Sequence, residues 1–397
     1  MKNKVVLVLA LIATSSTVQF TQAQTALQIN QTNKQVILYW TSTSGGTNCV
    51  LNSASSATPF DWAAATDAVP FNYGSKTALS VVSSVSVRYF RLSLIPPTGD
   101  GMALIPAGWY LIGDVADTNY NGDTAPTNVY VSAFYMDTNL VTYGLWQSVY
   151  SYATSHGYSF TNSGSAKASN QLVQPVETLN WYDSVKWCNA RSQQAGLTPV
   201  YFTDPGFTQI YTNGEIDAIY ANWRATGYRL PTEAEWEKAA RGGLKGLRFP
   251  WGQTVSESQA DYLVYLNNST HSIYFSYDLG PYSDNGYNPL GYGVYSPYTT
   301  AAGTFAANNY GLYDMAGNLE EWCWDWYDSN LTDPGSPYAG GVDPRGSPTN
   351  LYGINGGRVL RSGAWNDPAI LLRCPNRDYV PPATADFGKG FRCVRKY

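Results

Sequence analysis

The segment 309–327 constrains the fold more than any other part of this chain. Its nineteen residues, NYGLYDMAGNLEEWCWDWY, place three Trp, three Tyr and four carboxylates around two Gly. No single amphipathic helix or strand requires that mixture, because each needs a regular alternation of apolar and polar side chains. The segment therefore indicates a domain with an aromatic core and frequent turns.

The composition agrees with a loop-rich globular protein. Of the 397 residues, 44% are hydrophobic and only 13% are charged. A chain of this length can fill one large or two smaller cores, and we expect the α+β class. The net charge is −5 and no basic run occurs, which argues against nucleic acid or an anionic membrane as a partner. Small-molecule and protein ligands remain.

The N-terminus has the pattern of a signal peptide. Residues 1–13 give a basic start and an apolar run, and residues 21–23 give a small-residue cleavage site. Residues 1–23 are thus predicted to direct export to the periplasm, the medium or the cell surface; the alternative is a buried N-terminal strand. No segment reaches the roughly 18 consecutive apolar residues of a membrane span.

Residues 24–95 are rich in Ser, Thr, Ala and Val. β-branched or alternating runs at Val36–Thr41, Val81–Val87 and Tyr89–Leu94 predict strands. Turn-forming residues separate these runs, so this part resembles a small fibronectin type III-like β-sandwich. The segment 96–101, PPTGDG, is predicted to be a linker because of its Pro and Gly.

Residues 102–397 are predicted to form a second domain. Its first strands are expected at Met102–Gly113 and Val129–Asp137. Capping signals predict three helices, which begin after Thr142, Asn180 and Thr232 and end near Gly157, Gly196 and Gly242. Three acidic residues of the third helix point around it and are expected to cap it or to pair in solvent: Glu233, Glu235 and Glu237. After Pro250 the chain is mostly loop, which calls for ligands, metal or disulfides to organise it.

Three further blocks accompany the aromatic segment in a fixed order. Tyr228–Gly243 (YRLPTEAEWEKAARGG) precedes it, and Arg358–Asn366 (RVLRSGAWN) and Gly390–Val394 (GFRCV) follow it. Together the four blocks resemble the formylglycine-generating enzyme family, also called sulfatase-modifying factors, over about Gly101–Tyr397. The resemblance implies the loop-rich fold of that family, which is similar to C-type-lectin-like binding proteins, and an oxidase that acts on a sulfatase cysteine.

The resemblance also implies structural calcium. Asp314 and Glu321 bracket a turn whose carbonyl groups can face inward, and carboxylates with carbonyls are ligands that Ca²⁺ prefers. The alternative is that Asp314 and Glu321 cap turns or pair with Arg. The family binds calcium through positions that match Asp314, Gly317, Leu319 and Glu321, and a second calcium site is matched loosely by Asp261 and Tyr262.

The copper chemistry of the family is not expected in this chain. The family's oxidase holds Cu(I) with two thiols a few residues apart near the C-terminus. The matching segment here is Ser362–Cys374, in which Asp367 stands at the position of the first thiol and the second falls in a shortened loop without Cys. Because a carboxylate cannot replace a thiolate on Cu(I), the segment predicts a domain without the oxidase activity.

The chain contains five cysteines, at positions 49, 188, 323, 374 and 393. Cys188 and Cys393 match a pair that is disulfide-bonded in exported members of the family, so the resemblance implies a disulfide between them. Cys374 matches one half of a second family disulfide, so it is either free or paired with Cys323. The odd number leaves at least one thiol over, for which Cys49 is the natural candidate.

The resemblance finally implies a groove that binds an extended peptide, with a sulfatase as one candidate partner. A peptide or a glycan would suit it. The expected lining residues are Trp365, Asn366 and Asp367, with Arg361, Arg373 and Arg377 near the rim. Two alternatives stay open. One is an oxidase that uses Cys374 and Cys323 as a displaced thiol pair, and the other is a cell-surface adhesion module tethered by the N-terminal sandwich.

Overall fold

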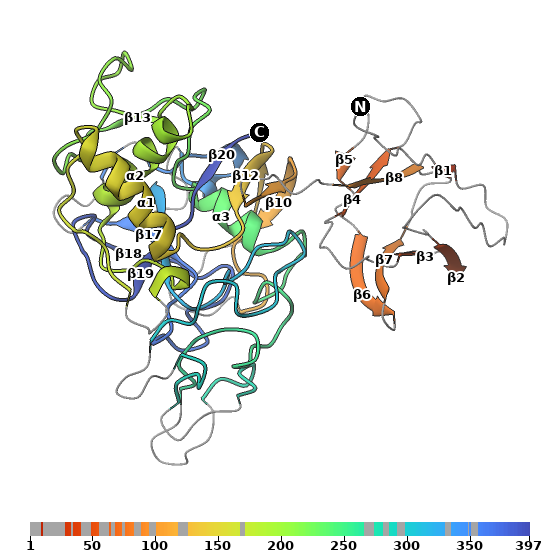
Figure 1. Cartoon of the computed structure of the whole chain (residues 1–397). Helices are drawn as coiled ribbons and strands as arrows, with labels where there is room; N and C mark the ends of the chain where they lie inside the picture. The colour runs from red at the N-terminus through yellow and green to blue at the C-terminus, as the bar shows by residue number, and fades with distance from the viewer. Residues whose placement is uncertain are drawn as a thin grey trace. The chain divides into compact units, whose positions relative to one another are not determined.

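A computed structural model describes the side chains of residues 101–397, with gaps at 118–125, 167–170, 266–273, 281–285, 292–297, 330–334, 348 and 351–355. Before residue 101 it describes only the backbone of strands (Figure 1). The chain divides into two compact units: residues 1–100 with 106–108, and residues 101–105 with 109–397. Apart from Leu9–Ala10 and Gly101, the predicted signal peptide and linker lie outside the described residues and stay predictions.

The first unit contains two four-stranded antiparallel sheets, with strand orders β1-β8-β4-β5 and β2-β3-β7-β6. Two of the three predicted strands correspond to β3 and β8, while Val81–Val87 overlaps β7 only at its start. The fibronectin-like packing of the sheets stays a prediction. The strands are β1 (Leu9–Ala10), β2 (Gln28–Thr32), β3 (Gln35–Trp40), β4 (Cys49–Ala54), β5 (Ala63–Ala64), β6 (Ala68–Tyr73), β7 (Lys76–Val82) and β8 (Tyr89–Leu94).

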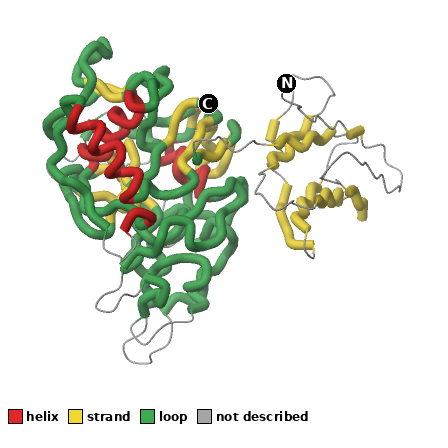
Figure 2. Tube along the Cα trace, viewed as in Figure 1, coloured by secondary structure: helices red, strands yellow, loops and turns green. Residues whose placement is uncertain are grey.

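The second unit is the α+β, loop-rich fold that the sequence predicts, and loops make up most of it in Figure 2. Its described strands form sheets in the orders β10-β11-β16, β20-β12-β9, β13-β14 and β18-β17-β15-β19. They are β9 (Met102–Ile105), β10 (Gly108–Ile112), β11 (Thr127–Val131), β12 (Phe134–Asp137), β13 (Tyr201–Phe202), β14 (Tyr220–Ala221), β15 (Glu320–Trp326), β16 (Gly341–Val342), β17 (Arg358–Arg361), β18 (Asp378–Val380), β19 (Lys389–Gly390) and β20 (Val394–Lys396).

The helices begin at the predicted caps. The side chains of Thr142, Asn180 and Thr232 each accept a hydrogen bond from the backbone three residues on, and Thr232 and Glu235 form the predicted capping box. None of the helices in the described part of the chain combines the length and apolarity of a membrane span. The helices are α1 (Tyr143–Ser155), α2 (Trp181–Gln194) and α3 (Glu233–Ala240), with 3₁₀ turns η1 (Gln171–Val173) and η2 (Pro337–Ala339).

Two predicted strands are each broken in the structure. Met102–Gly113 becomes β9 and β10, because Pro106 between them has no N–H to give to a sheet. Val129–Asp137 becomes β11 and β12, because the N–H of Ser132 is donated to the Asp343 carboxylate at 2.6 Å. Both breaks allow the neighbouring strands to join different sheets.

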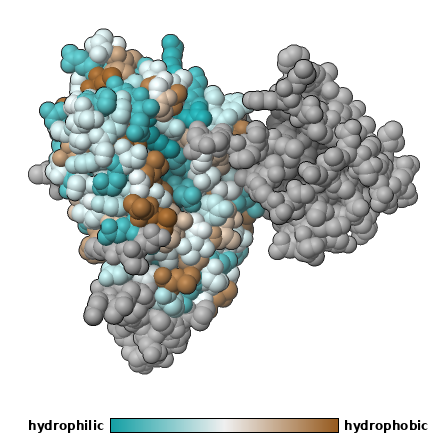
Figure 3. Space-filling model, in the orientation of Figure 1, coloured by the Kyte–Doolittle hydropathy of each residue, from teal (hydrophilic) through white to brown (hydrophobic). Residues whose placement is uncertain are grey.

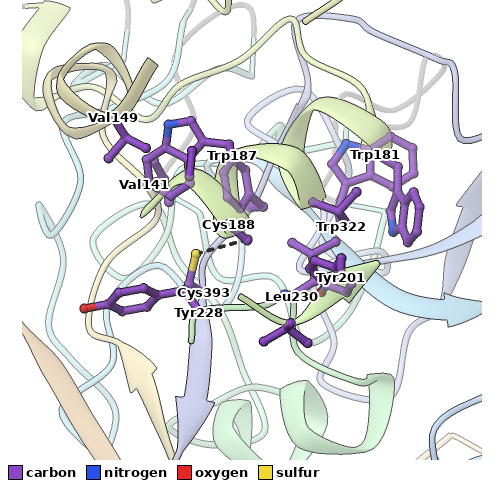
Figure 4. Packing of buried hydrophobic residues seen from close by; sticks show 14 of the residues in the cluster. Val141, Val149, Trp181, Trp187, Cys188, Tyr201, Tyr228, Leu230, Trp322 and Cys393 are labelled. Carbon is purple, nitrogen blue, oxygen red and sulfur yellow. Dashed lines mark hydrogen bonds between the residues drawn. The ribbon is translucent and has the colours of Figure 1, made fainter. Parts of the chain in front are cut away.

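The largest described core lies around α1 and α2. Trp146 and Trp187 stack with ring centroids 5.7 Å apart, and Phe391 packs edge-on against Trp187. Figure 4 shows Cys188 and Cys393 meeting beside these rings, joined by a dashed line. The C-terminal GFRCV block therefore packs directly against α2 and links the end of the chain to the centre of the domain.

Candidate functional site

Three arginines predicted at a groove rim are instead buried, and that prediction was wrong. Arg361 and Arg373 are each 1% exposed, and the side chain of Arg377 is also 1% exposed. The sequence could not show this, because the neutralising carboxylates lie 124 to 259 residues earlier. A guanidinium group that is buried with a carboxylate is not available to a ligand.

The carboxylates that hold two of these arginines come from α3. Arg361 donates to Glu237 at 2.5 Å and to Glu233 at 3.3 Å, while Arg377 donates to both oxygens of Glu233 at 2.5 and 2.9 Å. Arg241 donates to Glu237 at 2.7 Å. The prediction that Glu233 and Glu237 pair in solvent was therefore wrong, since both are fully buried.

The loop after β17 carries the first candidate site. Ser362 and Gly363 adopt φ values of 88° and 69°, a sharp turn that favours Gly at such positions. The turn is held by Ser362, whose hydroxyl donates to the Gly317 carbonyl at 3.2 Å. Beyond it, Trp365, Asn366 and Asp367 are half-buried, so the structure places these three predicted residues together at the surface.

The carboxylate of Asp367 is oriented by its own loop. Its Oδ2 accepts the Ala364 N–H at 2.8 Å, and its carbonyl accepts the N–H of Leu263 at 3.0 Å. Burial raises the pKa of Asp367 above its usual value, and the neighbouring Asp378 and Asp386 add to that effect. A carboxylate held in this way can accept a hydrogen bond or a positive charge from a ligand.

Other charged groups surround Asp367. Lys389 lies 3.2 Å from Glu320 and 2.8 Å from Asp386. Burial raises the pKa of Glu320 to about 8, an effect that Lys389 opposes and Asp367 strengthens. Glu320 and Asp386 share the Lys389 ammonium, whereas Asp367 and Asp378 form no ion pair among the described residues, so the region is short of positive charge when its acids are ionised. We call Glu320, Asp367, Asp378, Asp386 and Lys389, with the aromatic rings beside them, the Asp367 site.

A row of aromatic rings borders the Asp367 site. The ring centroids of Tyr287 and Trp365 are 5.8 Å apart, and those of Trp365 and Phe387 are 6.0 Å apart. Phe387 is 46% exposed. Exposed rings beside oriented carboxylates offer a ligand both apolar contact and charge recognition.

The family of the chain is shown by its sequence match. The Sulfatase-modifying factor enzyme 1-like domain matches residues 95–397. This chain belongs to that family. The formylglycine-generating enzyme of Thermomonospora curvata is 29% identical over 307 residues, which are 74% of this chain and 93% of that enzyme. The chaperone protein LppX of Paenibacillus barcinonensis is 32% identical over 204 residues, 50% of this chain and 65% of LppX.

Other relatives share only part of their length or only the fold. The chain covers about a quarter (26%) of the serine/threonine-protein kinase pkn1 of Chlamydia caviae, at 34% identity over 207 residues, 52% of this chain. Treponema denticola variable protein 1 superposes with a TM-score of 0.54 at 26% identity, covering 83% of this chain and 99% of that chain. CarF gives a TM-score of 0.54 at 24% identity, over 75% of this chain and 98% of CarF, and supports the fold alone.

The calcium ligands implied by the sulfatase-modifying factor resemblance do not all fit. Both carboxylate oxygens of Glu321 accept from Arg392, at 2.7 and 2.8 Å, and one also accepts from Trp236 at 2.9 Å. The alternative that Glu321 pairs with Arg is thus what the structure shows. Gly317 gives its carbonyl to Ser362, and Leu319 is buried beside β15. Glu321 is therefore removed as a side-chain calcium ligand.

Asp314 and Asp261 remain suited to a cation. Burial raises the pKa of Asp314 to about 6 and raises that of Asp261 well above its usual value, and the charge of Asp314 raises the pKa of Asp261 further. The Oδ1 atoms of Asp314 and Asn318 are buried without a hydrogen-bond partner. Asn318 and Thr300 both donate backbone N–H groups to Asp261 at 2.8 Å. Such orphaned oxygens fit a hard cation.

The weak second calcium site is not assembled as predicted. Asp261 belongs to the Asp314 cluster just described, whereas the Tyr262 hydroxyl donates to Asp278 at 2.5 Å. Among the residues that the structure describes, no group of three or more His, Cys, Asp or Glu is arranged to hold a metal ion. Any calcium bound here would therefore depend on amide and carbonyl oxygens as well as on Asp261 and Asp314.

The described cysteines are all buried thiols. The sulfur atoms of Cys188 and Cys393 are 3.5 Å apart without a covalent bond, so the predicted disulfide is not formed in this structure. Cys323 and Cys374 are each 0% exposed, and burial raises the pKa of Cys374 to about 12. Neither of these two is placed to act as a thiolate toward a bound peptide. The side chain of Cys49 lies outside the described residues.

Sequence reasoning missed Glu320 and Lys389 as members of the Asp367 site. Glu320 lies in the aromatic segment directly after Leu319, and a carboxylate in apolar surroundings was a signal that a charged partner lies nearby. Lys389 is the only Lys between residues 358 and 394. It pairs with Glu320 because β15 and β19 run parallel, with Glu320 opposite Lys389, and no local sequence pattern shows that pairing.

Asp325 provides a test of buried charge in this network. Burial, and then the charge of Glu233, raise the pKa of Asp325 to about 8; its Oδ2 accepts the Glu233 N–H at 2.8 Å and its Oδ1 has no partner. A raised carboxyl pKa means that stability is lost as pH rises from the ordinary value of 3.8 through about 8. Asp325→Asn stays neutral, so its stability relative to the parent should be about 3 kcal/mol more favourable at about pH 8.5 than at about pH 5.5.

Urea denaturation of Asp325→Asn and the parent protein at both pH values measures this difference. Asp204→Asn beside the parent is the control, because hydrogen bonds within its own turn lower the pKa of Asp204, which therefore stays ionised at both pH values. If the difference in free energy of unfolding between Asp325→Asn and the parent does not change with pH, the raised pKa of the buried Asp325 is contradicted.

Proposed function

We propose that this chain is a ligand-binding member of the sulfatase-modifying factor family that holds an extended peptide at the Asp367 site and lacks copper oxidase activity. The observation that carries the proposal is the pairing of two facts. An oriented carboxylate occupies the position at which the family resemblance places a thiol, and each cysteine whose side chain is described is buried.

The chemistry of the Asp367 site favours a basic ligand. Lys389 pairs with Glu320 and Asp386, while Asp367 and Asp378 have no cationic partner among the described residues. A Lys or Arg side chain in the ligand would supply the missing positive charge, and the row of Tyr287, Trp365 and Phe387 would pack against its alkyl part. A glycan lacks that charge, so peptides with Lys or Arg are the ligands that this geometry supports.

An array of extended eight-residue peptides tests the proposal. Peptides with Lys or Arg are expected to bind, and Asp367→Asn should weaken binding about tenfold or more because a charge-assisted hydrogen bond is lost. The fold should persist, since Asn keeps an acceptor for the Ala364 N–H. Asp204→Asn, in an exposed turn, should bind like the parent. Equal binding by Asp367→Asn, or binding of a glycan array alone, would contradict the proposal.

A second assay tests the absence of oxidase activity. The protein is supplied with Cu(I) and oxygen and a sulfatase-type Cys-x-Pro-x-Arg peptide, and the peptide is followed by mass spectrometry beside the formylglycine-generating enzyme of Thermomonospora curvata. The peptide should stay unchanged. Conversion of its Cys to the aldehyde, lost in Cys374→Ser, would establish the displaced-thiol alternative instead.

We also propose that calcium binds at Asp261 and Asp314 with the amide oxygen of Asn318. Calcium at about 100 times its Kd should stabilise the protein by about 2.7 kcal/mol. The measurement is thermal unfolding in calcium and in a chelator. Asp314→Asn should abolish the calcium-dependent rise in unfolding temperature. Glu321→Gln should lower the unfolding temperature but keep its dependence on calcium. A shift that disappears in Glu321→Gln alone would restore Glu321 as a ligand.

Export remains part of the proposal. N-terminal sequencing of the protein recovered from the periplasm or the medium of its host should show that the exported chain begins just after Ala23. Recovery of the protein only with Met1 intact would contradict a cleaved signal peptide.

A further inference from the structure

A second concave site lies away from the Asp367 site and shares no residue with it. It is a cavity of about 190 Å³, and the charged side chains that line it, beside Trp223, are Arg229, Glu235, Asp343, Arg345 and Lys396. We call it the Trp223 pocket. The start of α3, the segment after β16 and the last strand β20 contribute its walls. Figure 3 shows that the visible face of this unit is a mosaic of hydrophilic and hydrophobic residues, without one dominant apolar patch.

Trp223 fixes the two guanidinium groups of the pocket. The Cζ atom of Arg345 lies 4.5 Å from the Trp223 ring centroid, and that of Arg229 lies 5.0 Å from it. Trp223 is itself held edge-on by Trp324, at an interplanar angle of 87°. Cation–π contacts of this kind restrict the guanidinium groups before any ligand arrives.

The acids of the pocket already have partners. Glu235 receives two hydrogen bonds from Arg229, each at 2.6 Å. Asp343 accepts the N–H and the hydroxyl of Ser132, at 2.6 and 2.7 Å. Glu235 is therefore neutralised by Arg229. Asp343 keeps its charge, because its partner Ser132 is neutral, and it offsets part of the charge of Arg345.

Two cations of the pocket lack a carboxylate partner among the described residues. Arg345 and Lys396 form no ion pair there, in contrast to Arg229. Arg345 is exposed at the mouth of the pocket, where partial burial and then the nearby charge of Arg229 lower its pKa while Asp343 and Glu235 oppose that effect. Lys238 lies behind the wall, where its Nζ donates to the Val131 carbonyl at 3.0 Å and burial lowers its pKa to about 7, so it adds little positive charge at neutral pH. An anion would compensate these groups.

We propose that the Trp223 pocket binds the carboxylate of a small organic acid, with Arg345 as the residue that receives it. The planar guanidinium group matches a carboxylate with two parallel hydrogen bonds. The volume is below the roughly 300–1,000 Å³ of sites for drug-sized ligands, so the ligand is about the size of a monosaccharide or a dicarboxylate. This inference does not depend on the proposed peptide site.

Isothermal titration calorimetry of the full chain tests the proposal with glucuronate, succinate and glucose as probes. Both acids should bind and glucose should not, and binding should weaken as salt is raised because the interaction is between charges. Arg345→Gln should weaken acid binding about tenfold or more. Arg224→Gln is the matched control, because Arg224 is exposed beside Trp223 but does not line the pocket.

The outcomes separate the sources of the carboxylate. Tighter binding of glucuronate than of succinate supports a sugar acid, and the reverse supports a simple dicarboxylate; both support the proposal. Glucose binding as tightly as glucuronate would overturn it, as would acid binding that is unchanged in Arg345→Gln or absent at about millimolar concentrations. If the circular dichroism spectrum of Arg345→Gln matches that of the parent, the variant is folded and its loss of binding comes from the changed side chain.

Discussion

Replacing Arg361 with Met should lower the free energy of unfolding by about 3–5 kcal/mol. Arg361 is 1% exposed and donates to Glu233, Glu237 and the carbonyl of Cys374. Met fills a similar volume but removes this cation. Arg377 still donates to both oxygens of Glu233, so the loss falls mainly on Oε2 of Glu237, because Arg241 donates only to Oε1. Guanidinium chloride denaturation of the parent and the variant measures the loss.

Arg224→Met is the matched control for Arg361→Met. Arg224 is exposed, and a surface substitution of this kind should change stability by less than about 0.5 kcal/mol. The comparison also decides between the predicted and the observed place of Arg361. If Arg361→Met kept its stability but lost the binding of basic peptides, Arg361 would belong to a groove after all, and the buried network would be wrong.

Oxidation of Cys188 and Cys393 to a disulfide should stabilise the protein by about 5 kcal/mol. The two residues are 205 positions apart and their sulfur atoms lie 3.5 Å apart. A bond between them would close a very long loop, and the reduction in chain entropy of the unfolded state grows with the length of that loop. Thermal unfolding of refolded protein with and without a reducing agent measures the gain.

The thiols should be oxidised during refolding, because burial raises the pKa of Cys188 and the folded protein offers little thiolate for exchange. Cys393→Ala is the control, since it should show no shift on reduction. Mass spectrometry of peptides from the oxidised parent should recover Cys188 linked to Cys393. If a reducing agent still lowers the unfolding temperature of Cys393→Ala, the stabilisation belongs to another pair of cysteines.

Local interactions were the part of the fold that the sequence predicted well. Thr142, Asn180 and Thr232 cap the three helices because a helix start depends on residues within one turn of it. The family match over 95–397 likewise confirms the prediction made from four motif blocks. Strand ends were predicted less well, since the N–H of Ser132 leaves its sheet for Asp343, a residue 211 positions away.

The candidate sites were predicted only in part, for the same reason. Trp365, Asn366 and Asp367 are adjacent in sequence and reach the surface together. Their charged surroundings come from other strands, and the position of Lys389 opposite Glu320 is a property of the sheet. Burial of an arginine depends on a distant acid, so charge alone could not distinguish Arg361 in the core from Arg345 in a pocket.

The arginines of the last forty residues set an order for the folding of the domain. Arg361 and Arg377 neutralise Glu233, and Arg373 neutralises Asp114, across 128, 144 and 259 residues respectively. Glu235 and Glu237 of α3 can already pair with Arg229 and Arg241. Glu233 and Asp114, in contrast, take their arginines from the C-terminal segment and cannot be desolvated until it arrives. Such high contact order makes folding slow. The domain can complete its fold only after its C-terminal segment has been synthesised. A chain shortened before Arg358 should therefore not reach the folded state, even though the sequences of all three helices are present.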